Sequence, residues 1–280
     1  MSKSTQTPER LFIKGDDWLI EGHEAFAKQL LDSEGSGKAP NVLYVPTAKS
    51  SPERLEAGFR QVAEVFGKLG VGQVVQLHQY REAPSRDEAE HKFGEADIVY
   101  IGGGDSLEMM ENFKKWGTDT DLKNAIKGGK RVGGASAGQI ALMGPGFSDS
   151  MSYRNPANEW DYIWVNGMKI LNIANTPHLN SGIRDDASNL PPRKQAFLNA
   201  YARDSDLEHP QLPDKALGVS NGAMVMIDGD QAEISTVAPG GISAFRRESG
   251  NMHEQIFGGN PASGSGQIVT RADLGIAAAA

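Results

Sequence analysis

Short apolar runs alternate with longer amphipathic segments along the first half of the chain. The amphipathic segments repeat their apolar residues every three or four positions, which is the spacing of a helix with one buried face. The predicted strands are residues 41–45, 73–77, 96–101 and 131–133, and the predicted helices are residues 52–69, 107–116 and 121–127. This alternation favours an α/β fold with a doubly wound, mostly parallel sheet and helices on both faces.

The second half of the chain has a different pattern. Residues 147–166 mix aromatic and polar side chains, and we expect an irregular or hairpin segment there, either one wall of a ligand crevice or ordinary packing. Residues 192–201 have a helical pattern. Three closing strands are predicted at residues 216–219, 223–227 and 232–237. An Asp-Gly pair between the last two is typical of a hairpin turn.

These patterns predict one α/β domain over residues 11–247. Residues 1–10 are polar and are expected to form a flexible tail, and the Gly-, Ser- and Ala-rich residues 248–280 are expected to be a small, partly disordered appendage. In a parallel doubly wound sheet, ligands bind outside the carboxyl ends of the strands. The turns after residues 96–101 and 131–133 are therefore expected to meet at one crevice.

Composition narrows the class of function. The formal net charge of −8 argues against nonspecific binding to nucleic acid or to an anionic membrane surface. The chain has no cysteine, which excludes disulfides, a thiolate nucleophile and cysteine metal sites. No apolar run approaches the roughly 20 residues of a membrane helix, and no signal peptide is evident. We expect a cytoplasmic monomer or homodimer without a metal or other cofactor.

The motif Gly-Ala-Ser-Ala-Gly at residues 134–138 lies between a predicted strand and a helix-like continuation. In a nucleophile elbow the serine occupies a sharp strand-to-helix turn, and small neighbours relieve the crowding around it. The first amides of the following helix then lie beside the hydroxyl. We predict that Ser136 is an exposed nucleophile; the alternative is a tight Gly-Ser turn that only packs a helix close to a strand.

The motif Gly-Gly-Gly-Asp at residues 102–105 follows another predicted strand. A serine nucleophile needs N–H donors directed at the oxygen that becomes negative, and Gly104 and Ala137 are the candidates. Gly103 and Asp105 are further candidates for contact with the substrate. A phosphate-binding loop competes with this interpretation, although the glycine fingerprints of such loops are absent here; a plain turn is the other alternative.

A serine hydroxyl also needs a base that takes its proton. Of the six histidines, His178 is the candidate, because it follows an apolar segment and a proline that restricts the backbone. His78 ends a predicted strand and is the weaker rival. The alternative for His178 is an ordinary loop position, and His91, His209 and His253 are expected to be solvated.

The order of motifs along the chain resembles that of the peptidase E (aspartyl dipeptidase) and cyanophycinase family of serine hydrolases. These motifs are Gly-Gly-Gly-Asp, Gly-Ala-Ser-Ala-Gly, Pro-His and a basic helix. The resemblance runs from about Leu11 to Ile234, and Val-Pro-Thr-Ala at residues 45–48 is similar to the end of the family's first strand. It implies a class I glutamine-amidotransferase-like fold. It also implies the role of nucleophile for Ser136 and of base for His178.

The resemblance further implies oxyanion donors at Gly104 and Ala137 and an arginine that binds an acidic substrate side chain. Arg193, in Pro-Arg-Lys-Gln at residues 192–195, falls at that arginine's position, with Arg184 as a second choice. A planar guanidinium can bind a carboxylate through two parallel hydrogen bonds. The alternative is an exposed arginine at the start of a helix.

The third member of the catalytic group departs from the family's pattern. Relatives have Glu or Asp in a short Gly-x-x-[Glu/Asp]-Gly element, and this chain has Asn221 there. An asparagine oxygen can orient an imidazole but cannot offer it a full negative charge. Three outcomes are possible: Asn221 orients His178, a carboxylate such as Asp185 or Asp186 takes over this role, or catalysis has been lost. The alternative for Asn221 itself is an ordinary turn residue before Gly222.

Two functions of different classes follow. The first is a serine peptidase that cleaves short peptides after an acidic residue through an acyl-enzyme, with cyanophycinase-like cleavage of β-aspartyl-arginine as a close variant. The second is a non-catalytic relative that binds a small acidic metabolite, motivated by Asn221. A glutaminase is a poor third, because its nucleophile is normally a cysteine.

Overall fold

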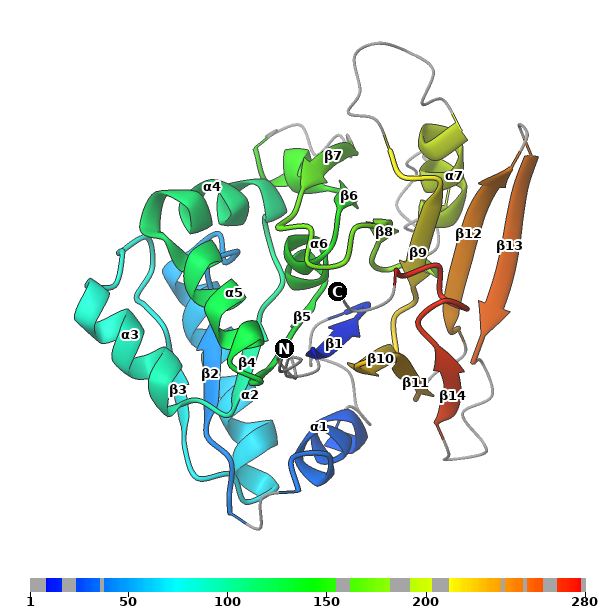
Figure 1. The fold of residues 1–280 in the computed structure, drawn as a ribbon. Helices are drawn as coiled ribbons and strands as arrows, with labels where there is room; N and C mark the ends of the chain where they lie inside the picture. Colours follow the sequence, from blue (N-terminus) through cyan, green and yellow to red (C-terminus); the bar gives the residue numbers. More distant parts are fainter. Residues whose placement is uncertain are drawn as a thin grey trace, which may run out of the picture.

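Two β-sheets form the framework of the molecule (Figure 1). The computed structural model describes residues 9–16, 24–35, 38–154, 162–181, 192–202, 212–237, 240–248, 251–258 and 266–277. The predicted tail at residues 1–10, much of residues 248–280, and Arg184, Asp185, Asp186 and His209 lie wholly or partly outside these ranges. Among the described helices, none is long and apolar enough to span a membrane.

The larger sheet combines a parallel and an antiparallel part. Five strands run parallel, in the order β1 (Arg10–Lys14), β5 (Arg131–Ala135), β4 (Ile98–Ile101), β2 (Val42–Val45) and β3 (Val74–Gln76). On the other side of β1, the antiparallel strands are β10 (Ala223–Asp228), β11 (Gln231–Thr236) and β14 (Gln267–Thr270). β1 therefore lies between the two parts and pairs with both.

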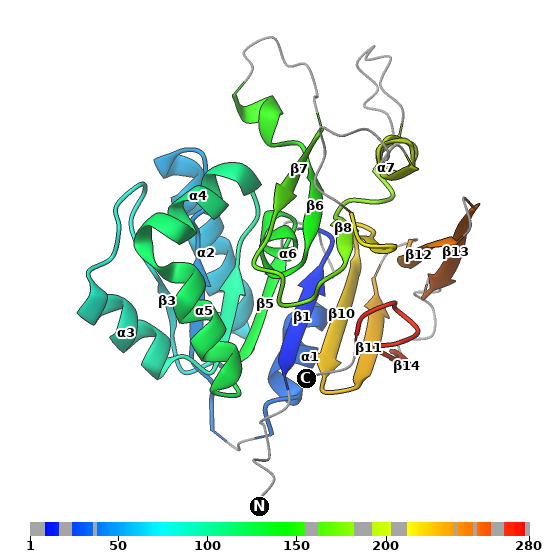
Figure 2. The ribbon, with the colours of Figure 1, turned by 45° about the horizontal axis from the view of Figure 1, so that its top comes forward.

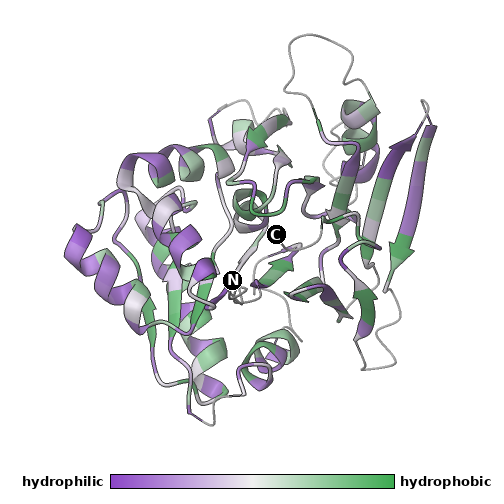
Figure 3. Ribbon diagram, in the orientation of Figure 1, coloured by the Kyte–Doolittle hydropathy of each residue, from purple (hydrophilic) through white to green (hydrophobic). Residues whose placement is uncertain are grey.

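Helices cover both faces of the parallel part, as the sequence predicted. On one face, apolar side chains of α1 (Glu24–Asp32) and α2 (Pro52–Lys68) pack against the strands. The other face is covered by α3 (Arg86–Glu95), α4 (Ser106–Trp116), α5 (Thr118–Lys127) and α6 (Ala137–Leu142). In Figure 2, α5 lies in front of the strands and α2 behind them, and Figure 3 shows apolar residues concentrated in the strands.

The smaller sheet has six strands of mixed direction. Its order is β13 (Asn251–Phe257), β12 (Ile242–Glu248), β9 (Lys215–Val219), β8 (Ala174–Thr176), β6 (Pro145–Ser148) and β7 (Ile163–Asn166). A one-turn 3-10 helix, η1 (Ser150–Tyr153), follows β6, and α7 (Arg193–Ala202) packs Phe197 and Tyr201 against the sheet. The sheets meet where the chain passes from β9 to β10 through Ser220–Gly222.

The fold differs from the prediction in two respects. A mostly parallel sheet was expected, whereas the chain forms a second sheet and an antiparallel flank. Two pairs of later strands are hairpins, whose strands run antiparallel: β10–β11, which the sequence predicted, and β12–β13. The described residues beyond 247 are also more than an appendage. β13 extends the smaller sheet and β14 extends the larger one.

Candidate active site

Ser136 stands at the junction of β5 and α6. Its backbone has φ 54° and ψ −112°, a positive φ that is costly for a residue with a side chain. The turn is closely packed: a Cβ on Gly134 would lie 2.4 Å from the carbonyl carbon of Gly138, and one on Gly138 would lie 2.2 Å from the oxygen of Ile101. The Ser136 amide donates to the carbonyl of Lys14 at 3.1 Å. These contacts hold the Ser136 backbone in one position.

His178 follows β8 and Pro177, and it also has a positive φ of 54°. Its Nε2 lies 2.8 Å from Ser136 Oγ, and its Nδ1 lies 2.6 Å from Asn221 Oδ1. An amide oxygen only accepts hydrogen bonds, so the proton of the neutral ring belongs on Nδ1. Nε2 is then free to accept the proton of the serine hydroxyl. The residues singled out in three separate parts of the sequence thus form one hydrogen-bonded chain.

Asn221 lies on the crossing from β9 to β10 and is fixed by its neighbours. Its backbone amide donates to Asn180 Oδ1 at 2.7 Å, and its side-chain Nδ2 lies 3.4 Å from Ser181 Oγ. With Nδ2 directed at Ser181, the amide oxygen faces His178. Of the alternatives for this position, Asp185 and Asp186 lie outside the described residues.

The surroundings of His178 keep the ring neutral. Burial lowers the pKa of His178 below its ordinary value of 6.5, and the positive charge of Arg193 lowers this pKa further. The hydrogen bond to Asn221 and the negative charges of Asp149 and Asp16 act in the opposite direction. At neutral pH the imidazole is therefore available as a proton acceptor.

A cavity of about 460 Å³ opens beside Ser136. Ser136, His178 and Asn221 line it together with Gly103 and Gly104 of the glycine turn. The other lining residues come from the end of β1, from β2 and the segment after it, from α2 and from η1. They are Asp16, Tyr44, Lys49, Ser50, Arg54, Ala57, Gly58, Gln61, Val62 and Tyr153.

The two predicted oxyanion donors lie close to this cavity. Gly104 has φ 142°, and a Cβ there would lie 2.0 Å from the carbonyl oxygen of Ala48, so only glycine fits the turn. Ala137 is the first residue of α6, and the first amides of a helix have no acceptor within the helix. Both positions are compatible with the predicted role, which remains a prediction.

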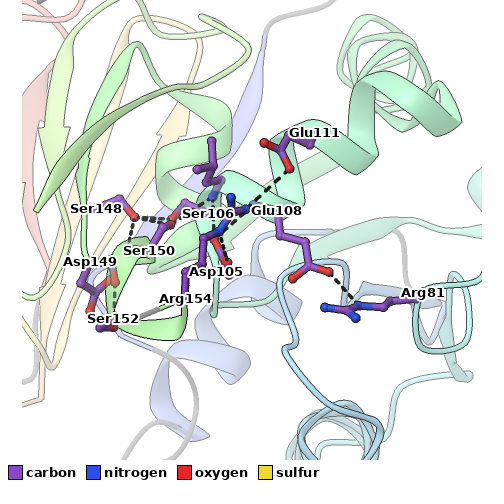
Figure 4. Close-up of polar contacts among 11 residues, drawn as sticks. Arg81, Asp105, Ser106, Glu108, Glu111, Ser148, Asp149, Ser150, Ser152 and Arg154 are labelled. Carbon is purple, nitrogen blue, oxygen red and sulfur yellow. Dashed lines mark hydrogen bonds and ion pairs between the residues drawn. The ribbon is translucent and has the colours of Figure 1, made fainter. Parts of the chain in front are cut away.

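Asp105, predicted to contact the substrate, instead caps α4. Its Oδ1 accepts hydrogen bonds from the amides of Leu107 at 2.9 Å and Glu108 at 3.1 Å (Figure 4). The hydroxyl of Ser150 also accepts from the Leu107 amide and lies 2.8 Å from the hydroxyl of Ser148. This network joins the glycine turn and α4 to the β6–η1 segment, and Asp105 itself is not among the cavity-lining residues.

Arg193, predicted to bind an acidic side chain, is only 4% exposed and is engaged within the protein. Its Nη2 donates to the carbonyl of Phe147 at 2.8 Å, its Nε donates to Thr176 Oγ1 at 3.2 Å, and its Nη1 lies 3.5 Å from Asp149. The guanidinium also lies over the ring of Tyr162. Arg193 therefore supports the segment around β8 and does not belong to the lining of the cavity.

His78, the weaker rival for the base, is buried elsewhere. Its Nε2 lies 2.7 Å from Thr47 Oγ1, its Nδ1 lies 2.6 Å from the carbonyl of Gln79, and its ring contacts Trp116 edge-on. It does not line the cavity. His91 and His253 are exposed, as expected.

Sequence reasoning missed Asp16, Lys49 and Arg54. Lys49 follows the strand predicted at residues 41–45, and the carboxyl end of a parallel strand is a ligand-binding position, so that signal was present. Asp16 follows β1, which was not predicted as a strand. Arg54 belongs to the predicted helix at residues 52–69, but periodicity alone does not tell which polar residue faces a cavity.

A serine hydroxyl bonded to a histidine whose other nitrogen is bonded to an amide or carboxylate oxygen is the arrangement of a serine hydrolase. In this molecule it lies at the carboxyl ends of parallel strands in an α/β fold. The fold and the site thus define the class before any comparison is made.

Comparison with known proteins identifies the family. The model of peptidase family S51 matches residues 19–235, most of the chain, so the chain belongs to peptidase family S51, a family of serine-type peptidases. It is 25% identical over 136 residues to the uncharacterized peptidase YgaJ of Bacillus subtilis, an alignment that spans 49% of this chain and 56% of that protein. It is also 25% identical over 151 residues to the uncharacterized peptidase Lin0382 of Listeria innocua, spanning 53% and 68% of the two chains.

Solved structures share the fold. A peptidase from an acI-B1 actinobacterium superposes with a TM-score of 0.64 at 17% identity, covering 95% of this chain and 98% of that one. A putative peptidase E protein from Listeria monocytogenes superposes with a TM-score of 0.57 at 16% identity, covering 83% and 100%. The match to the S51 model confirms the family predicted from the sequence motifs.

Proposed function

We propose that this serine-type peptidase hydrolyses short peptides after an N-terminal acidic residue, with Ser136 as nucleophile, His178 as base and Asn221 as the residue that orients the base. The observation that carries this proposal is the continuous hydrogen-bonded chain from Ser136 Oγ through the ring of His178 to Asn221 Oδ1, at 2.8 and 2.6 Å. It opens onto a cavity large enough for a short peptide.

The chemistry proceeds in two steps. Nε2 of His178 takes the Ser136 proton as Oγ attacks the scissile carbonyl, and the amides of Gly104 and Ala137 stabilise the oxygen that becomes negative. His178 then returns the proton to the leaving amine, which leaves an acyl-enzyme. Water, activated by the same nitrogen, hydrolyses the ester. The neutral resting state of His178 suits the first proton transfer.

Preference for an acidic residue is supported by two cations of the cavity, Lys49 and Arg54. Asp16, the lining residue of opposite charge, is paired at 2.7 Å with the buried Lys14. With two cations and one carboxylate in its lining, the cavity is positive on balance in a protein whose net charge is −8. Both cations also lie near Tyr153, where their charges oppose the burial that raises the pKa of this phenol. This assigns to Lys49 and Arg54 the carboxylate recognition that was predicted for Arg193.

The test uses purified protein with Asp-p-nitroanilide and Asp-Leu, and with the matching Asn compounds as uncharged controls. The acidic substrates should be cleaved at a higher kcat/KM. Ser136→Ala should lower kcat by about a million-fold, the cost of removing a triad serine. Ser33→Ala is the matched control and should leave the activity unchanged, because the Ser33 hydroxyl donates to the Leu30 carbonyl and Ser33 is not among the cavity-lining residues of the described chain. Arg54→Gln should narrow the Asp-over-Asn preference, whereas Arg60→Gln on the same helix should not.

A fluorophosphonate probe separates this proposal from a non-catalytic relative that binds small acids. The latter is motivated by the neutral Asn221. Labelling of wild-type protein, lost in Ser136→Ala, would indicate an activated serine. Absence of labelling, or equal peptide cleavage by wild type and Ser136→Ala, would contradict the proposal.

A further inference from the structure

The end of β1 contacts Ser136, His178 and Gly222, the residue that follows Asn221. The carbonyl of Lys14 accepts from the Ser136 amide at 3.1 Å, and the carbonyl of Gly15 accepts from the His178 amide at 3.3 Å. The carboxylate Oδ1 of Asp16 accepts from the amide of Gly222, the residue after Asn221, at 3.2 Å. Three consecutive residues thus position three segments that are far apart in sequence.

The sheet register explains this convergence. β1 pairs in parallel with β5, whose end leads to Ser136, and antiparallel with β10, which begins directly after Asn221 and Gly222. Lys14 is the partner of both Ala135 and Met224. Asp16, two residues further on, therefore lies level with the catalytic turns on both sides.

Asp16 is a buried carboxylate paired with a buried lysine. It is 5% exposed, Lys14 is completely buried, and Lys14 Nζ lies 2.7 Å from both Asp16 Oδ1 and the Asp16 carbonyl oxygen. Burying such a pair is costly, and well-packed apolar residues would often serve stability as well or better. Stability is therefore a weak reason for this pair, and its position beside the catalytic residues suggests another.

The hydrogen-bond partner of the His178 Nδ1 is the amide of Asn221 and not a carboxylate. When Ser136 reacts, the ring of His178 becomes positive, and an amide oxygen gives less stabilisation than a negative charge. Of the groups whose charges act on His178, Arg193 opposes the protonated ring, while Asp149 and Asp16 favour it. Both carboxylates have a cationic partner: Arg193 lies 3.5 Å from Asp149, and Lys14 lies 2.7 Å from Asp16. Arg193 lowers the pKa of His178 more than Asp149 raises it, whereas Lys14 is not among the main charges that act on His178. Asp16 also lines the cavity with His178 and Asn221.

We propose that Asp16 is a positioning residue of this active site: it fixes the Asn221–Gly222 turn through the Gly222 amide and supplies the negative charge near His178 that Asn221 lacks. The Lys14 ammonium is the partner of the Asp16 carboxylate within the protein. The inference rests on the proposed function for the roles of Ser136 and His178.

The test is Asp16→Asn, which keeps an oxygen for the Gly222 amide and for Lys14 but removes the charge. The readout is the second-order rate of inactivation by a fluorophosphonate as a function of pH, which reports activation of the serine whether or not a peptide is cleaved. We expect the plateau rate to fall about tenfold. The acidic limb should move to lower pH, because loss of a negative charge lowers the pKa of His178. Asn221→Asp in the same background should restore the rate.

Asp121→Asn is the matched control. Asp121 is a buried carboxylate on α5, away from the cavity, and it lies 2.7 Å from Arg86 of α3. Removal of its charge should lower the melting temperature without changing the pH profile of inactivation. If Asp16→Asn does not fold, the double variant Lys14→Met/Asp16→Asn, which also removes the buried ammonium, is measured instead. Any of three outcomes would overturn the proposal. They are an unchanged inactivation rate and pH profile, a lower rate with an unchanged acidic limb, and failure of both variants to fold.

Discussion

At the scale of single residues, the orientation of one amide decides how the site works. Asn221 presents its oxygen to His178 because its Nδ2 is directed at Ser181 and its backbone is held by Asn180. In a protease where asparagine replaces the triad aspartate, the amide selects the wrong tautomer and the rate falls by about 10⁴. Here the acceptor faces the ring, so the tautomer is the productive one.

It follows that Asn221→Asp should raise activity. The carboxylate keeps the hydrogen bond to Nδ1 and adds a charge, so we expect kcat/KM to increase about tenfold, a smaller change than the tautomer error costs. The pKa of His178 should rise, which moves the acidic limb of the pH profile to higher pH. Asn180→Asp, which adds the same charge next to the turn without contacting the ring, is the control. A rate for Asn221→Asp at or below that of wild type would show that the neutral amide is preferred.

At the scale of elements, the β5–α6 turn depends on close backbone contact. Gly138→Ala would place a methyl group 2.2 Å from the Ile101 carbonyl, so we expect about 1–3 kcal/mol of destabilisation together with slower serine labelling. Gly94→Ala in α3 is the matched substitution, since no atom lies within 4 Å of its added Cβ. It should gain about 0.5–1 kcal/mol. Calorimetry measures both changes, and equal shifts in melting temperature would contradict this account of the turn.

The elements also show how far sequence reasoning reaches. The long amphipathic helix at Pro52–Lys68 and the apolar strands β2, β4 and β5 were predicted to within two residues at each end, because burial imposes their pattern. β1 was not predicted, since it begins and ends with charged residues whose burial depends on distant partners: Arg10 pairs with Glu34, and Lys14 with Asp16. No bounds were predicted for α3, because its sequence is charged on nearly every side.

The site was predictable where backbone geometry restricts the residue type. Ser136 between small residues and His178 after proline have such signatures. Arg193 had a helix-start position but no signal that its guanidinium is used by Phe147 and Thr176 instead of a ligand. Asp16 and Arg54 enter the site only through tertiary packing, which a linear pattern does not contain.

At the scale of the whole molecule, two buried histidines connect stability to pH. Burial is the main reason that the pKa values of His78 and His178 lie below 6.5 in the folded protein. As pH falls below 6.5, the unfolded chain takes up protons before the folded chain does, so the free energy of unfolding should decrease. The stabilisation that comes from these two neutral histidines is fully present above pH 6.5, and it is lost as the pH falls to their pKa values in the folded protein.

Urea unfolding at a series of pH values measures this effect. His78→Gln keeps a hydrogen-bonding group for Thr47 and should reduce the dependence on pH below 6.5. His253→Gln, at an exposed position, should leave it as in wild type. If the free energy of unfolding varies with pH in the same way for wild type, His78→Gln and His253→Gln, the assignment of this dependence to His78 is contradicted.

The passage from β9 to β10 gives the molecule a particular order of completion during synthesis. A chain synthesised as far as α7 already contains Ser136 and His178, but the strands that bring Asn221 into place are still to come. Under the proposed mechanism, the contact that orients His178 needs both the crossing and the pairing of β10 with β1. A chain that stops before β10 is therefore expected to be a poorer peptidase than one that includes it.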